Sequence, residues 1–381
     1  MRSAILNRGL RLHHPYTSIY EHDERERGES LEVVGLVRHI TKRKGDKKMK
    51  KMKILSLIMA IMLVLAACSS GDSKEEGSEK GKVIKWKMGH LADENHIWHK
   101  TAQEFADKVK EKTDGEIEIT IYPNNSLGGE TDTINSIQAG TADLVISGET
   151  LQNWAPKAAL MAVPYAFDGI DHVKTVVEGD IGKEIEEQIH EEAGLTALYY
   201  HTRAPRNLTS NEKIETPADL KGFSMRVPNV PLFLKVWEAA GAKPQVMDFN
   251  EVFTGLQQGV IKGQENPVDL IQSSGLYEVQ KYVDRTEHVY SWIYMLVGNK
   301  QFEALTDDQR KAVQEAAAEA QEFGAELYDE TIESIENDLK EKGMEFVEVD
   351  KKAFSDLMLP AVKDSLSPEQ NELFEKILST K

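Results

Sequence analysis

The hydrophobic pattern of the chain begins with one uncharged apolar run and continues as alternating short strands and helices. Residues 54–67 form the run, and period-2 and helical patterns alternate from Val83 onward. The spacing predicts strands over 83–89, 117–122, 142–147, 195–200 and 223–226. It predicts helices over 97–113, 130–139, 249–258 and 306–339, with another beginning near Pro231. Strands that alternate with helices indicate an α/β fold.

The apolar run is predicted to be the core of a signal peptide over residues 49–67. It has 14 residues, whereas a membrane-spanning helix needs roughly 20, and five lysines lie between residues 47 and 53. The run ends in Leu65-Ala66-Ala67-Cys68, which resembles a lipobox, the motif in which the cysteine is acylated after cleavage. The alternative is a buried cysteine that follows an apolar helix. Cys68 is the only cysteine, which excludes an internal disulfide.

The segments on either side of this signal are predicted to lie outside any folded domain. Residues 68–82 are rich in Gly, Ser and charge, a composition typical of a flexible tether. Residues 1–48 precede the basic region, although signal peptides begin close to theirs. We expect translation to start at Met49 or Met52; the alternative is a genuine disordered extension that starts at Met1.

Charge divides the chain unevenly and limits the classes of partner. Residues 1–67 carry 14 Lys/Arg and 7 Asp/Glu, whereas residues 68–381 carry 32 and 57, giving net charges of +7 and −25. A body this acidic repels phosphate backbones and anionic headgroups, so we expect no nucleic-acid partner. An anionic small ligand would need local positive charge.

Searches for catalytic and metal-binding motifs are negative. The sequence has no GxSxG, P-loop, HExxH or CxxC spacing. His90, His96 and His99 fall within one loop and helix start, without a cysteine or a clear carboxylate partner at ligand spacing. We therefore expect no metal, no cofactor and no enzymatic activity.

Linked motifs in the middle of the chain resemble one family. They include TRAPRN at 202–207, PADLKGFSMRVPN at 217–229, DFNEVF at 248–253 and GQENP at 263–267. With supporting matches at 122–130, 140–144 and 164–167, the chain resembles the solute-binding subunits of tripartite ATP-independent periplasmic (TRAP) transporters, the DctP family. The resemblance covers about residues 83–345.

The resemblance implies a carboxylate-binding site. Arg226 matches the arginine that clamps the ligand carboxylate, and a planar guanidinium suits bidentate binding of that group. Asn266 matches an asparagine that bonds the same carboxylate, with a turn residue as the alternative. Arg206 matches a second arginine, although Arg203 is close enough to exchange roles with it. Surface ion pairs are the alternative for Arg226 and Arg206.

Four further residues are candidate ligand contacts with structural alternatives. Phe249 is a pocket wall or a core aromatic, and Glu130 is a hydroxyl acceptor or a first-turn acid favoured by the helix dipole. Glu149 is a hydroxyl acceptor, although the glutamate of sialic-acid-binding members aligns one residue away. His90 follows the first strand, where members place a ligand contact. Together with His96 and His99, it resembles members that bind sugar acids such as uronates.

The implied fold has two α/β lobes with a ligand cleft between them, like type II periplasmic-binding proteins. We expect lobe I to comprise residues 83–203 and 292–333, and lobe II to comprise 204–291 and 334–381. The implied protein is an exported, lipid-anchored monomer that delivers an organic acid to a TRAP permease driven by an ion gradient.

Several alternatives remain open at this point. The ligand is a sugar acid or a C4-dicarboxylate. The chain could instead serve an ABC importer, sense ligand for a kinase, or be a secreted enzyme that uses Glu149 and a histidine as acid and base.

Overall fold

The computed structural model describes residues 83–380. The predictions for the N-terminal extension, the signal peptide, Cys68 and the tether fall outside this range. Within it, none of the helices combines the length and the apolar character needed to cross a membrane. These described residues belong to one compact unit.

The first sheet has five strands in the order β2-β1-β3-β10-β4. Strand β1 runs parallel to β2 and β3, and β10 runs antiparallel to β3 and β4. Its strands are β1 (Ile84–Gly89), β2 (Ile117–Tyr122), β3 (Leu144–Ser147), β4 (Leu195–Thr202) and β10 (Trp292–Gly298). The helices between these strands are α2 (Ile97–Lys112), α3 (Glu130–Gln138), α4 (Ile170–Glu178) and α5 (Asp180–Gln188), with α9 (Asn299–Glu303) after β10.

The second sheet has six strands in the order β11-β9-β5-β8-β6-β7. Strand β8 lies between β5, which is antiparallel to it, and β6, which is parallel to it. Its strands are β5 (Arg206–Ser210), β6 (Ser224–Val227), β7 (Lys243–Val246), β8 (Gly263–Asn266), β9 (Tyr282–Val289) and β11 (Glu345–Glu348). The associated helices are α6 (Pro231–Ala239), α7 (Phe249–Gln257), α8 (Val268–Ser273) and α11 (Lys351–Ser365).

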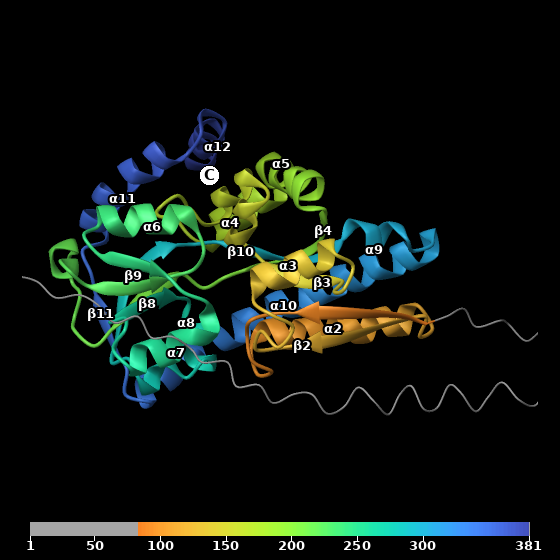
Figure 1. The fold of residues 1–381 in the computed structure, drawn as a ribbon, viewed down its shortest axis with the longest axis horizontal. Coiled ribbons are helices and arrows are strands. Elements are labelled where there is room, and N and C mark those ends of the chain that lie inside the picture. Colours follow the sequence, from red (N-terminus) through yellow and green to blue (C-terminus); the bar gives the residue numbers. More distant parts are fainter. Residues whose placement is uncertain (1–82, 381) are drawn as a thin grey trace, which may run out of the picture. The chain divides into compact units, whose positions relative to one another are not determined.

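The longest helix, α10 (Asp307–Glu341), packs against elements of both sheets (Figure 1). It contacts α2 and β4, which belong to the part of the chain around the first sheet, and α8, which is associated with the second. Thr306 caps its first turn, and Gln309 returns the bond to complete a capping box. The last helix, α12 (Pro368–Ser379), packs against the 3₁₀ helix η2 (Pro156–Ala162).

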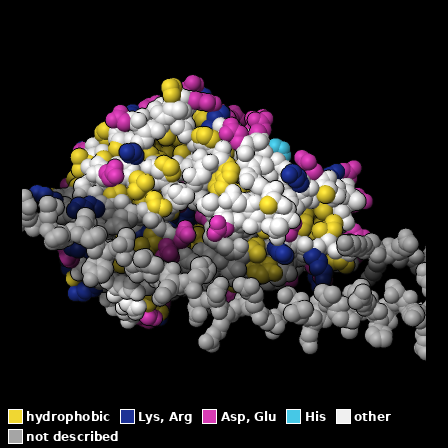
Figure 2. Space-filling model, viewed as in Figure 1, with side chains coloured by type: hydrophobic (Ala, Val, Ile, Leu, Met, Phe, Trp, Pro, Cys, Tyr) yellow, Lys and Arg dark blue, Asp and Glu magenta, His cyan; other side chains and the backbone are white. Residues whose placement is uncertain are grey.

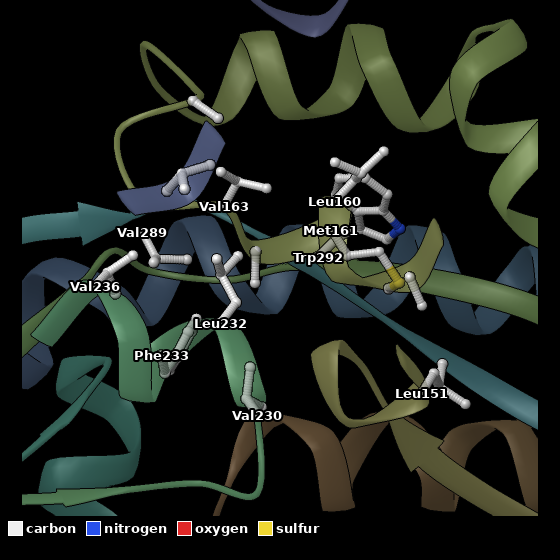
Figure 3. Packing of buried hydrophobic residues seen from close by; sticks show 14 of the residues in the cluster. Leu151, Leu160, Met161, Val163, Val230, Leu232, Phe233, Val236, Val289 and Trp292 are labelled. Carbon is white, nitrogen blue, oxygen red and sulfur yellow. The ribbon is translucent and has the colours of Figure 1, made fainter. Parts of the chain in front are cut away.

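One buried hydrophobic cluster includes side chains from both sheets. It contains Val145 and Tyr294 of the first sheet together with Leu208 and Met225 of the second. Figure 3 shows Leu232 and other side chains of α6, with Trp292 of β10, pointing into the same interior. The two sheets therefore share one core along part of their contact.

The mixed α/β architecture with two sheets agrees with the two-lobed fold expected from the sequence. The chain passes from the first sheet to the second between Thr202 and Arg206 and returns between Val289 and Trp292. The exact lobe boundaries stay a prediction. Helix α12 is assigned to lobe II in that prediction, yet it contacts η2, which precedes β4; Gln370 Nε2 donates to Pro156 O at 2.6 Å.

Candidate functional site

A cavity of about 270 Å³ lies where strands of both sheets end. Strand β3 ends at Ser147 on one side, and β6 and β8 end at Val227 and Asn266 on the other. Ligands of open α/β sheets bind at the carboxyl ends of strands in this way. Among the lining residues are Leu91, Trp98, Asn125, Glu130, Asp132, Ser147, Gly148, Glu149, Thr150, Arg203, Arg206, Arg226, Asn229, Met247, Asp248, Phe249, Asn266, Leu270 and Ile293.

Arg226 brings a buried and unpaired positive charge to this cavity. It lies on β6 and is only 4% exposed; its Nε donates to Met247 O at 2.8 Å, and its guanidinium carbon lies 5.6 Å from the ring centroid of Phe249. Within residues 83–380, no carboxylate oxygen lies within 4.0 Å of its nitrogens. Burial lowers the pKa of Arg226 to about 10, so it remains charged at neutral pH.

Arg203 and Arg206 also line the cavity, but each already has carboxylate partners. Arg203 Nη1 lies 3.2 and 3.1 Å from the two carboxylate oxygens of Glu149. Arg206 Nη1 donates to Glu149 at 3.3 Å, and its Nε and Nη2 donate to Glu265 at 2.5 and 2.7 Å. Most of the five N–H donors of Arg206 are therefore used inside the protein.

The buried carboxylates of this network stay ionised because of the arginines. Burial alone would raise the pKa of Glu265, but Arg206, helped by His288, lowers it to about 2. Burial likewise acts to raise the pKa of Glu149, and Arg203 and Arg206 outweigh it, so the pKa lies below its ordinary value. Glu149 and Glu265 thus neutralise two of the three arginines.

Asn266 and Phe249 line the same cavity as Arg226. Asn266 ends β8, where it pairs with Asn207 of β5, and its Nδ2 donates to Gln264 Oε1 at 2.6 Å. Phe249 begins α7 and supports the guanidinium of Arg226. Asn266, Phe249, Arg206 and Arg226 therefore all line one cavity. Their contacts with a ligand stay predictions.

Glu130 and Glu149 form the opposite part of the lining. Glu130 begins α3, and its Oε1 contacts the Ser147 hydroxyl and accepts from Gly148 N–H at 3.4 Å. Burial raises the pKa of Glu130; the Ser147 hydrogen bond opposes this effect, and the charge of Glu149 adds to it. Glu149 lines the cavity and is bound by Arg203 and Arg206; its acceptance of a ligand hydroxyl stays a prediction.

His90 is not among the residues that line this cavity, and its contact with a ligand stays a prediction. Its neighbour Leu91 lines the cavity instead. The His90 ring is buried, with Nε2 3.1 Å from His99 Nδ1, and burial lowers the pKa of His90 to about 3, assisted by His99 and His96. His96 Nδ1 accepts the Trp98 N–H and caps α2, and its Nε2 lies 3.2 Å from Asp269. Across the part of the chain that the structure describes, no metal-binding cluster is found.

Arg203, Asp248 and Trp98 are among the lining residues that were not proposed as primary ligand contacts. Arg203 and Asp248 lie inside the quoted motifs, so closer attention to every charged motif residue would have found them. Trp98 follows helical spacing, which is also typical of a core residue, and no sequence signal separates the two roles. In the structure, the guanidinium carbon of Arg203 lies 5.3 Å from the Trp98 ring centroid.

Comparisons with known proteins agree with this geometry. Residues 88–369 match the DctP family, described as bacterial extracellular solute-binding protein, family 7. A solute-binding protein of Roseobacter denitrificans is 49% identical over 293 residues, which cover 77% of this chain and 90% of the relative. The 2,3-diketo-L-gulonate-binding periplasmic protein of Escherichia coli is 31% identical over 281 residues, covering 73% and 85%.

Solved structures give the same result. A TRAP periplasmic solute-binding protein of R. denitrificans with bound L-galactonate has a TM-score of 0.76 and 48% identity, covering 78% of this chain and 99% of that one. One from Xanthobacter autotrophicus with bound β-D-galacturonate has a TM-score of 0.75 and 26% identity, covering 78% and 100%. These findings favour neither an ABC-importer subunit nor an enzyme. The chain belongs to the DctP family and is a solute-binding protein of the TRAP transport class.

Proposed function

We propose that this protein captures a sugar acid outside the cytoplasm by binding its carboxylate to Arg226, and delivers it to a TRAP membrane permease. The observation that carries the proposal is the unpaired positive charge of Arg226 in the cavity. Arg226 is buried, held in place by Met247 O, and has no carboxylate partner within residues 83–380. An unpaired buried cation is costly, and a ligand carboxylate supplies the missing partner.

The ligand class rests on the cavity and on the relatives together. Related proteins were solved with L-galactonate, β-D-galacturonate and D-glucuronate. Each of these three ligands carries one carboxylate group and several hydroxyl groups. Besides Arg226, the cavity lining includes an amide at Asn266 and acceptors at Glu130 and Asn125. Asn266 is expected to bond the same carboxylate, and Arg206 to orient it.

Export of the protein is supported by its family, whereas its lipid anchoring is supported by the sequence alone. The family is extracellular by its description, which implies that this chain is exported. We further propose that Cys68 carries the lipid anchor, that residues 69–82 form the tether, and that the protein acts as a monomer. An anchored binding protein would stay close to the permease.

Isothermal titration with L-galactonate, D-galacturonate and D-glucuronate tests the carboxylate clamp. The body Glu79–Lys381 is suitable, since it spans 99% of a homologous crystal structure. Arg226→Ala should lose about 2–5 kcal/mol of binding free energy, the cost typical of removing a buried charge partner. Arg310→Ala, at the start of α10 and away from the cavity, is the matched control and should bind normally. Equal binding by the wild type and Arg226→Ala would refute the clamp.

A further inference from the structure

The two walls of the cavity differ in charge. One wall, at the ends of β6 and β8, presents Arg226 and Asn266. The other, at the end of β3 and the start of α3, presents Glu130 beside Ser147 and Gly148. A ligand that places its carboxylate on the first wall therefore extends its far end toward a carboxyl group.

The remaining arginines do not offset the acid on the second wall. Arg203 and Arg206 share Glu149, and Arg206 also binds Glu265 through two nitrogens. Their charges are already matched by the two carboxylates. A second carboxylate of a ligand would thus meet Glu130 without finding a free cation among the described residues that line the cavity.

Glu130 itself is held as an acceptor. Its Oε1 contacts the Ser147 hydroxyl and lies 3.4 Å from Gly148 N. Because both donors point to that oxygen, the carboxyl group is fixed and cannot turn away without losing them. Ligand hydroxyl groups can donate to such a group, whereas a second carboxylate has no hydrogen to give.

We infer that Glu130 is a specificity-determining residue that rejects a second carboxylate, so that the protein selects polyhydroxy acids with one carboxylate against the corresponding diacids. This inference rests on the proposed function, because it assumes that Arg226 holds the first carboxylate. In this inference Glu130 does more than accept hydrogen bonds from hydroxyl groups. It selects ligands whose far end is uncharged.

Proton uptake gives a second signature. Glu149 is the acid whose charge acts on Glu130, and Glu149 is itself bound by Arg203 and Arg206; Asp132 and Asp248 also line the cavity. Burial and Glu149 already raise the pKa of Glu130, and a second ligand carboxylate would raise it further. Binding of a diacid then requires Glu130 to take up a proton, so its affinity should increase as the pH falls.

The sharpest test uses L-galactonate and galactarate, which differ only in whether carbon 6 is an alcohol or a carboxylate. Titration calorimetry of the wild type should give a dissociation constant for galactarate about 100-fold or more above that for galactonate, because like charges in contact are strongly unfavourable. In Glu130→Gln, which keeps the size and the acceptor oxygen, the ratio should fall below about tenfold. Only the galactarate affinity of the wild type should increase between pH 8 and pH 5.

Asp248→Asn is the matched control, since it removes an acid from the lining on the Arg226 side. It should change both affinities by the same factor. Equal wild-type affinities for the two acids, or an unchanged ratio in Glu130→Gln, would overturn the inference. Galactonate binding that survives Arg226→Ala would instead refute the proposed function, so the two failures are distinguishable.

Discussion

Asp284 on β9 is a buried acid whose surroundings favour the protonated form. It is 0% exposed; its Oδ2 lies 2.6 Å from Ser210 Oγ, and that hydroxyl lies 2.5 Å from Glu212 O. One hydroxyl hydrogen cannot serve both contacts, so both are satisfied only when Asp284 donates to Ser210. Burial raises the pKa of Asp284 to about 7, although Ser210 and the Ile214 N–H act to lower it.

The consequence for stability has a definite sign. In the unfolded chain, the Asp284 carboxyl group has its ordinary pKa of 3.8. Between pH 4 and pH 7, Asp284 is therefore protonated more often in the folded state than in the unfolded state. Stability is therefore full at low pH and falls as the pH rises through this window. Since one pKa unit corresponds to 1.36 kcal/mol, ionised Asp284 costs about 4 kcal/mol above pH 7.

Asp284→Asn should remove this cost, because the amide donates to Ser210 as the protonated acid does. Relative to the wild type, its stability advantage should grow by about 2–3 kcal/mol between pH 5 and pH 8, as linkage requires. Urea unfolding of Glu79–Lys381 at several pH values measures it. Asp356→Asn, on the surface of α11, is the control and should leave the pH dependence unchanged. A difference between wild type and Asp284→Asn that does not vary with pH would show that Asp284 is ionised throughout.

Two further predictions concern the arginine network and the anchor. Glu265→Gln should destabilise the fold by about 3–5 kcal/mol in urea unfolding, because it leaves the buried Arg206 without its main carboxylate partner; a loss below about 1 kcal/mol would contradict this. In cells given a labelled fatty acid, the wild type should incorporate the label and sediment with membranes, whereas Cys68→Ser should do neither. Labelled Cys68→Ser would place the acylation elsewhere.

Regular hydrophobic patterns predicted helices and strands correctly where one side of the element is buried. The helix predicted over 306–339 is α10 at Asp307–Glu341, because a Thr306–Gln309 capping box marks its start and strong helix formers follow. The strand predicted over 117–122 is β2, with the same bounds. In these segments the local pattern and the tertiary environment favour the same structure.

Strand β8 shows why the rest could not be predicted in this way. Its residues Gly263–Asn266 are buried but contain no apolar side chain, so no period-2 hydrophobic pattern exists. Their polar groups are satisfied by distant residues, among them Thr209 for Gln264 and Arg206 for Glu265. Motif resemblance located this segment, and only the structure shows that Glu265 neutralises Arg206. The contact between His90 and His99 is likewise not encoded by strand and helix patterns.

The net charge of the body and the charge of its proposed ligand have the same sign, and burial reconciles them. Acidic side chains are scattered over the face shown in Figure 2, with Lys and Arg between them. Exposed charges are screened within about 8 Å at physiological ionic strength, so their sum acts weakly on a ligand inside a cavity. Arg226 is screened far less because it is buried. Since Glu149 and Glu265 occupy the other arginines, the described residues that line the cavity offer one unmatched positive charge, which suits an anion with a single carboxylate.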